Sequence, residues 1–189
     1  YSFNITKIVS KRVKRNPLAP FTTSTLQQEA SNKLGFGASR TMRIAQKLYE
    51  GVNIGSETTG LITYMRTDGV QLSSQAIEEL REEIINRHGK DYIPQIPRVY
   101  KSKAANAQEA HEAIRPTSIS RDPEDMSQYL DTEQLKLYEL IWKRTISSQM
   151  QSAELDETSA DISNQDMSIV FRANGSQVSF PGFFIYRDR

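Results

Sequence analysis

A tyrosine and an arginine two positions apart, Tyr64 and Arg66, stand in the short run GLITYMRTDG at residues 60–69. Positions i and i+2 of an extended segment project from the same face, so the guanidinium can lie beside the phenol hydroxyl. A tyrosine is a weak nucleophile at neutral pH unless a nearby cation favours the phenolate, and an arginine fork also matches a phosphate. The pair could therefore attack and hold a phosphodiester. The alternative is a core tyrosine followed by a surface arginine.

A second group of polar residues lies in the run QEAHEAIRP at residues 108–116. We expect a short helix over residues 108–114, ending before Pro116, which would place His111 and Arg115 on one face. A histidine there could carry a proton or contact a phosphate, and the alternative is a structural or surface histidine. The run approaches the zinc-protease pattern, but Arg115 occupies the position of the second histidine, which excludes that class.

The composition excludes several kinds of site. The 189 residues are 37% apolar and 25% charged, as in a globular protein with a sizeable core. The absence of cysteine excludes disulfides and thiolate metal sites, and two histidines argue against an all-protein zinc site. No apolar run has the length of a membrane span. We therefore expect a cytoplasmic protein with no membrane contact and no metal held by this chain.

Positive charge is concentrated at the start of the chain. The net charge is +1, yet the first 20 residues contain five cations and no acid. Such a basic arm suits contact with a polyanion. The alternative is a strand edge on which lysines discourage aggregation. The chain also begins with Tyr1 inside an alternating pattern, from which we expect a piece of a longer protein.

Two short helices are predicted before the Tyr64 segment. Ser24 and Gln27 fit a capping box for a helix that ends at Gly35, and a second helix is expected over residues 39–50. With a Gly-Phe-Gly turn between them, they form a helix-turn-helix candidate. A buried extended segment is expected over residues 61–65, in which Tyr64 would lie.

The remaining pattern predicts strands at both ends of a helical middle. Long helices are expected over residues 73–88 and 131–150, and a strand over residues 2–10. Two short strands, at 168–172 and 177–181, would form a hairpin about the Asn-Gly dipeptide at 174–175. We predict an α+β fold in which the two ends pair in one antiparallel sheet. The predicted domains are residues 1–19 and 151–189, which form strands, and residues 20–150, which form a helical insertion.

Four runs of the sequence resemble, in order and spacing, the bacterial type IA DNA topoisomerases. They are PFTTSTLQ at 20–27, TMRIAQKLY at 41–49, GLITYMRTD at 60–68 and EAHEAIRP at 109–116. The resemblance covers nearly the whole chain and is weakest beyond residue 156. Four runs in register are far more specific than any one of them.

The resemblance implies a chemistry for several residues. Tyr64 would attack a DNA phosphodiester, forming a 5′-phosphotyrosine link, and the strand would be resealed without ATP after strand passage, relaxing negative supercoils. Arg66 would contact the scissile phosphate and stabilise charge there, and His111 would support that phosphate or a neighbouring acid. Together with Arg66, we expect three further residues to contact DNA: Arg43, Lys47 and Arg115.

The resemblance also implies the setting of this chemistry. The helical domain would carry CAP-like helix-turn-helix elements inserted in a β-rich arch, in a nucleoid-associated enzyme. Its partners would be a single-stranded segment of negatively supercoiled DNA and the remaining domains of the same polypeptide. Mg²⁺ would be needed, with ligands outside these residues, so the chain alone should be nearly inactive. Gly69 stands where many members carry serine, which could change the local turn.

Two other classes were weighed against this interpretation. A DNA-binding helix-turn-helix module without chemistry would also explain the basic arm and the paired helices. Tyrosine recombinases and type IB enzymes use tyrosine, arginine and histidine as well, but their His-x-x-Arg pair precedes the tyrosine. In this sequence His111 follows Tyr64, and its arginine is four residues away, so order and spacing argue against that class.

Overall fold

The computed structural model describes residues 2–101 and 111–187. They form two compact units, which we call the sheet unit and the helical unit. The sheet unit consists of Tyr1–Asn16 and Gln151–Arg189, and the helical unit is Pro17–Met150. The α+β class is confirmed, because antiparallel sheets and α-helices both occur. In the described part, no helix combines the length and the apolar character needed to cross a membrane.

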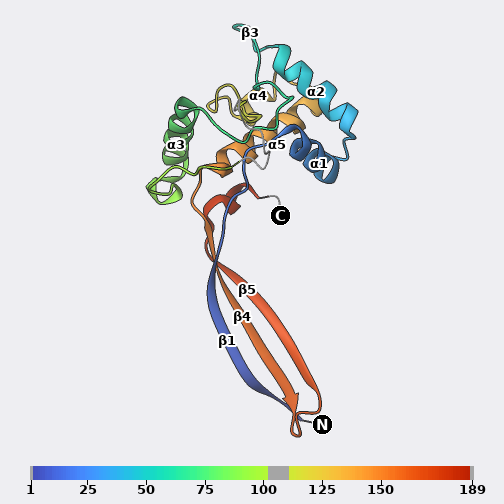
Figure 1. Cartoon of the computed structure of the whole chain (residues 1–189), viewed down its shortest axis with the longest axis vertical. Helices are drawn as coiled ribbons and strands as arrows, with labels where there is room; N and C mark the ends of the chain where they lie inside the picture. Colours follow the sequence, from blue (N-terminus) through green and yellow to red (C-terminus); the bar gives the residue numbers. More distant parts are fainter. Residues whose placement is uncertain (1, 102–110, 188–189) are drawn as a thin grey trace. The chain divides into compact units, whose positions relative to one another are not determined.

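Three antiparallel strands build the sheet unit, in the order β1 (Phe3–Arg15), β4 (Ala153–Asn164) and β5 (Val170–Phe180) (Figure 1). The two ends of the chain therefore pair in one sheet, as predicted, and β1 continues well past the predicted residues 2–10. Along β1 the residues that follow the apolar alternation are polar, yet the continuous ladder with β4 keeps them extended.

The hairpin predicted at residues 174–175 is wrong. Asn174 and Gly175 lie inside β5, where they pair with Ser159 and Thr158 of β4. The chain instead turns between β4 and β5, where Met167 adopts a positive φ of 57°. An Asn-Gly dipeptide makes a hairpin when its two flanks pair with each other. Here both flanks pair with β4, so the two predicted short strands are one.

Acids of β4 neutralise most of the basic arm. Four of its five cations form ion pairs across the β1–β4 ladder: Lys11 and Arg15 with Glu157, Arg12 with Asp156, and Lys14 with Glu154. Opposite charges in cross-strand positions support sheet pairing. This arrangement favours the strand-edge interpretation of the arm over a free polyanion-binding surface.

Helices supply most of the helical unit, and α5 lies at its centre in contact with α1, α2 and α4 (Figure 1). The described helices are α1 (Thr23–Leu34), α2 (Ala38–Glu50), α3 (Ser74–His88), α4 (Pro123–Met126) and α5 (Thr132–Ser148). Two-residue strands, β2 (Val52–Asn53) and β3 (Thr58–Thr59), pair between α2 and the Tyr64 segment. Single 3₁₀ turns follow α3 at Lys90–Tyr92 and β5 at Gly182–Tyr186.

Most helix ends follow the predicted capping chemistry. Gly35 ends α1 in the left-handed conformation (φ 68°), and Ser73 and Asp131 cap α3 and α5. The cap of α1 is the exception: Thr22 forms the capping box with Thr25, not Ser24 with Gln27. Either the Thr22–Thr25 pair or the Ser24–Gln27 pair could satisfy the first N–H groups, and the helix begins at the earlier one.

The α5 face that meets the core carries large side chains with a polar end. Tyr138 and Trp142 are almost fully buried, and each donates one hydrogen bond to a backbone carbonyl. The Tyr138 hydroxyl donates to Arg121 O at 2.6 Å, and Trp142 Nε1 donates to Ile119 O at 2.9 Å. These bonds hold the segment that precedes α4 against α5, as buried phenol and indole groups require partners.

Candidate active site

Tyr64 is a surface residue, so the core-tyrosine interpretation is wrong. Its side chain is 51% exposed, whereas the neighbouring Met65 is 1% exposed. Arg66 is exposed and Thr67 is buried, so exposure alternates along residues 64–67. The chain bends at Met65 and Arg66, so a shared face for the tyrosine and the arginine stays a prediction.

The start of α1 fixes the backbone on the C-terminal side of Tyr64. Thr23 Oγ1 donates to Met65 O at 2.7 Å and accepts from the Thr67 N–H at 2.8 Å. The Thr23 N–H also donates to Thr67 O at 2.9 Å. Because backbone bonds on both sides of Arg66 are satisfied by one threonine, the arginine is presented from an ordered segment.

The helix predicted over residues 108–114 is wrong at residues 111–114, and its first three residues lie outside the described part. Residues 111–116 are extended and form isolated bridges with three other segments: Glu112 with Gln71, Ile114 with Phe21, and Pro116 with Ile62. Tertiary pairing here outweighs the helical propensity of the Glu-Ala-His-Glu-Ala run, as it commonly does for short segments. His111 and Arg115 therefore do not share a helical face.

Hydrogen bonds tie this second segment to the N-terminal side of Tyr64. The Thr63 N–H donates to Arg115 O at 2.9 Å, and Thr63 Oγ1 donates to Ala113 O at 2.7 Å. In return the Arg115 N–H donates to Thr63 Oγ1 at 3.0 Å. The two motifs that the sequence marks for chemistry thus belong to one hydrogen-bonded unit.

Gly69 brings the backbone of His111 close to the Tyr64 segment. A Cβ built on Gly69 would lie 1.8 Å from the His111 carbonyl oxygen, far inside contact distance. The absence of a side chain therefore permits this approach, and any larger residue needs a local shift. The His111 side chain is exposed, so its imidazole is accessible to a ligand.

Arg115 is already engaged by a carboxylate. Its guanidinium donates to Glu112 in a bidentate pair, Nε to Oε1 at 2.8 Å and Nη2 to Oε2 at 3.2 Å. Burial alone would raise the pKa of Glu112, but the hydrogen bonds from Arg115 and the Ser73 backbone and the charge of Arg115 hold the pKa below its usual value. This pair makes Arg115 a weaker candidate for DNA contact than Arg66.

A hollow of about 490 Å³ opens beside Arg66, and we call it the arginine hollow. The two arginines that line it, Arg43 and Arg66, are exposed, and neither forms a hydrogen bond or ion pair with another residue of the described part. Lys47 is exposed one turn further along α2 but does not line the hollow. The other lining residues were missed by the sequence analysis: Gln27, Ala38, Ser39, Met42 and Gln46.

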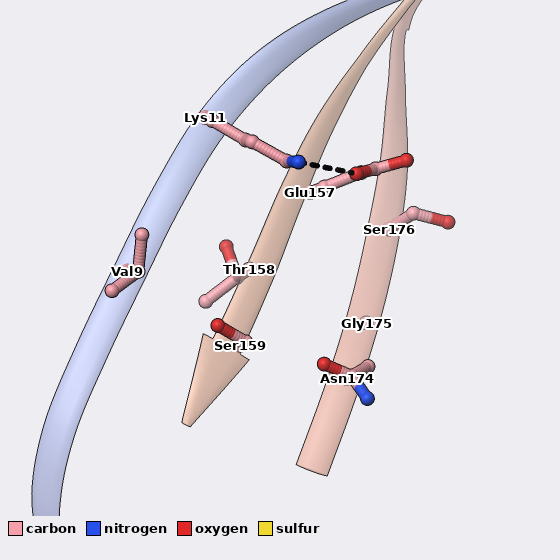
Figure 2. Close-up of a pocket in the computed structure, with 8 residues that line it drawn as sticks. All are labelled: Val9, Lys11, Glu157, Thr158, Ser159, Asn174, Gly175 and Ser176. Atoms are coloured by element: carbon pink, nitrogen blue, oxygen red, sulfur yellow. Dashed lines mark ion pairs between the residues drawn. The ribbon is translucent and has the colours of Figure 1, made fainter. Parts of the chain in front are cut away.

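A second hollow, of about 430 Å³, lies on the sheet unit (Figure 2). Val9 and Lys11 of β1 line it from one side, and Ser176 of β5 is among the residues on the other. The Lys11 Nζ reaches across to Glu157, 3.7 Å away, so the cation of this hollow has an acidic partner. The arginine hollow differs, because its two arginines form no hydrogen bond or ion pair with a described residue.

The described residues present no group that could hold a metal ion. Three or more His, Asp or Glu side chains do not gather at one place among residues 2–101 and 111–187. Catalytic divalent ions in phosphoryl-transfer sites are held by carboxylates together with phosphate oxygens. A Mg²⁺ site does not fit these residues.

Comparisons with known proteins agree with the sequence resemblance. A family model described as DNA topoisomerase matches residues 1–189. DNA topoisomerase 1 of Rickettsia bellii is 55% identical over 99% of this chain, and that of Xylella fastidiosa (strain Temecula1) is 53% identical over 95%. The structure of full-length topoisomerase I from Thermotoga maritima is 39% identical over 99% of the chain, with a TM-score of 0.86.

These relatives are much longer than the chain. The chain spans 24% of the Rickettsia bellii protein, 22% of the Xylella fastidiosa protein and 30% of the Thermotoga maritima structure. The family match nevertheless covers every residue, and the high TM-score shows that the fold is shared. The chain belongs to the bacterial type IA DNA topoisomerases, a family of isomerases.

Proposed function

We propose that Tyr64 cleaves and rejoins one DNA strand by transesterification. The phenol oxygen bonds to the phosphorus of a phosphodiester, and the bond from phosphorus to the 3′ oxygen breaks. The phenol gives up its proton, the released strand leaves with a 3′-hydroxyl, and the other end stays attached through a 5′-phosphotyrosine. Because one ester replaces another, resealing needs no ATP.

Arg66 and His111 support the phosphate in this proposal. Arg66 is exposed two residues after Tyr64, and a guanidinium can neutralise the charge that builds on the phosphoryl oxygens. His111 is exposed at the start of the segment that is tied to Thr63, so its imidazole can contact the phosphate or a neighbouring acid. Arg115, held by Glu112, stabilises this segment.

The observation that carries the proposal is the exposed Tyr64 within an otherwise fixed segment. Half of its side chain faces solvent while its neighbours are buried or hydrogen-bonded on both sides. Its ring also packs edge-on against Tyr49, with the centroids 5.3 Å apart, which limits its rotation. A nucleophile that is both accessible and held in place satisfies the positional requirement of displacement at phosphorus.

The wider activity rests on segments that the relatives have in addition to this region. We propose passage of a strand through the break, relaxation of negative supercoils, and binding of single-stranded DNA, with a CAP-like role for α1 and α2. A magnesium ion, if required, is held by residues outside this chain and would supply charge neutralisation at the phosphate. The chain by itself should relax no supercoils, and appreciable relaxation by it alone would contradict this.

The experiment places this chain in the Rickettsia bellii relative, in exchange for the matching segment of that protein. The chimaera is incubated with magnesium and labelled single-stranded DNA, and denaturing gels reveal covalent protein–DNA adducts. Tyr64→Phe removes the attacking hydroxyl and keeps the ring, so no adduct should form. The matched control is Tyr129→Phe, at another exposed tyrosine of the helical unit, and it should retain the adduct.

A chimaera that binds DNA yet forms no adduct would contradict the proposal. An adduct that persists in Tyr64→Phe would contradict it as well, because another residue would then be the nucleophile. Loss of the adduct in both tyrosine variants would point to general disruption of the helical unit and would also count against a specific role of Tyr64.

A further inference from the structure

The arginine hollow extends the site beyond the attacked phosphate. It is lined from α1 by Gln27, from α2 by five residues that include Arg43, and from the Tyr64 segment by Arg66. Arg66 therefore belongs both to the proposed reaction centre and to the wall of the hollow. A ligand that fills the hollow therefore lies next to the phosphate that Arg66 is proposed to bind.

The chemistry of the lining suits a second phosphate of the same strand. Arg43 and Arg66 contribute two guanidinium groups that form no hydrogen bond or ion pair with another described residue. No acid is among the lining residues, and Glu133, which interacts with the charge of Arg43 from outside the lining, forms an ion pair with Arg40. Arginine forks bind phosphate oxygens bidentately, and unpaired arginines lining one hollow favour a polyanion.

Polar and apolar neighbours complete the fit to single-stranded DNA. The Ser39 hydroxyl and the Gln27 amide can donate to phosphate or sugar oxygens, and α2 begins here without a side-chain cap. The thioether of Met42 is half-buried and gives an apolar surface on which a base can rest. A single strand needs such a combination of backbone donors and base contacts.

We propose that the arginine hollow binds the phosphate of single-stranded DNA adjacent to the one that Tyr64 attacks, with Arg43 as the main contact. This inference rests on the proposed function and names the part of the strand that the helical unit holds. Arg43 is a binding residue in this account, and its contribution is to keep the broken strand in register.

The test measures binding of a fluorescein-labelled oligothymidine to the 189-residue chain over a series of salt concentrations. Arg43→Gln should weaken binding about tenfold, because a charge-assisted contact is lost. It should also reduce the slope of log K against log salt by about 0.7, the value for one phosphate on a single strand. Arg43→Lys keeps the charge and should preserve the slope.

The matched control is Lys136→Gln, which removes an exposed cation of α5 that does not line the hollow. It should leave the slope unchanged. The inference is overturned if Arg43→Gln behaves like Lys136→Gln, or if the unmodified chain binds no oligothymidine at low salt. This assay measures binding and the adduct assay measures cleavage, so failure of the hollow and failure of the cleavage chemistry are distinguished by separate experiments.

Discussion

Two hollows among the described residues, one on each unit, have similar volumes but a different electrostatic balance. In the sheet unit, Lys11 reaches across the strands to Glu157, and most neighbouring cations of β1 have acids of β4 as partners. In the helical unit, Arg43 and Arg66 line a hollow that contains no acid. The sequence shows its densest positive charge in the first region and only scattered arginines in the second. Charge density along a sequence is therefore a poor guide to an anion site, because partners decide which cations are available.

Among the substitutions that test this comparison, removal of Arg66 should have the largest effect. In the chimaera, Arg66→Ala should lower the rate of DNA cleavage about 100- to 1,000-fold, since the charge at the attacked phosphate loses its partner. Single-turnover cleavage assays measure this rate. Arg12→Ala removes a cation of β1 and should leave the rate unchanged, and equal losses in both variants would break the comparison.

The tyrosines show the same contrast between side chains that have a partner in the protein and side chains that face solvent. Tyr100 donates its hydroxyl proton to Ser148 O at 2.8 Å, and burial raises its pKa to about 12. Tyr100→Phe should lower the free energy of unfolding by about 1 to 2 kcal/mol, because buried carbonyls lose their donor. Denaturant unfolding at neutral pH checks this value, and Tyr64→Phe should leave stability unchanged. A stable Tyr100→Phe would contradict the structural role of this hydroxyl.

The same hydroxyl predicts an alkaline dependence of stability. The pKa is near 10 in the unfolded chain and about 12 in the folded one. Below pH 10 both states hold the proton, so the contribution of this hydroxyl to stability is fully present and does not change with pH. As pH rises from 10 to 12 the unfolded chain ionises first, and the contribution is lost. The difference between the unmodified chain and Tyr100→Phe should narrow over that range, and a constant difference would contradict the raised pKa.

The Glu112–Arg115 pair separates a structural arginine from the arginines of the hollow. Glu112→Gln should lower the free energy of unfolding by about 1 kcal/mol, because the pair is partly exposed and solvent screens it. The pKa of Glu112 is held below its usual 4.5, so the contribution is present above that pH and lost as pH falls through the lowered value. Acid unfolding curves of the unmodified chain and of Glu112→Gln measure this contribution. Equal acid sensitivity would show that the pair contributes nothing.

The smallest effect is expected in the sheet unit. Arg12→Gln removes the cation of the exposed ion pair with Asp156. The hydrogen bond and charge of Arg12 lower the pKa of Asp156. The pair is screened by water, so we expect no measurable change in unfolding and none in oligothymidine binding. Parallel thermal melts and anisotropy titrations test both expectations. A weakening of DNA binding as large as that of Arg43→Gln would erase the distinction between the two regions.

Local patterns predicted the elements that depend on local chemistry. The helices at residues 73–88 and 131–150 have a capping side chain at the start and apolar stripes at helical spacing, and both occur with small changes at their ends. The left-handed Gly35 followed from the need for a residue without a side chain there. The residues that determine such features lie within a few positions of each other in the sequence.

Two elements that depend on distant partners were predicted wrongly, although the pairing of the two chain ends was predicted correctly. The run around His111 has helical propensity, but Gln71, Phe21 and Ile62 pair with it from elsewhere in the chain. The Asn-Gly dipeptide at 174–175 remains in a strand because β4 pairs with both of its flanks. The residue spacing within each run gives no information about these distant partners.

The candidate site divides in the same way. The exposure of both Tyr64 and Arg66 agrees with the prediction from their i, i+2 spacing, whereas their shared face stays a prediction because the chain bends at residues 65–66. The hollow beside them was not, because it joins Gln27 of α1 to the polar side of α2. Its one local signal is the spacing of Ser39, Met42, Arg43 and Gln46, which places these residues on one helical face.

The measurement that tests the central claim most directly is the polarity and position of the covalent link. The chimaera is incubated with magnesium and single-stranded DNA labelled at either the 3′ or the 5′ end, and the adduct is digested for mass spectrometry. Our account predicts that the adduct retains the 3′ label and that the phosphate is attached to Tyr64. An adduct that retains the 5′ label, or attachment at another residue, would contradict it.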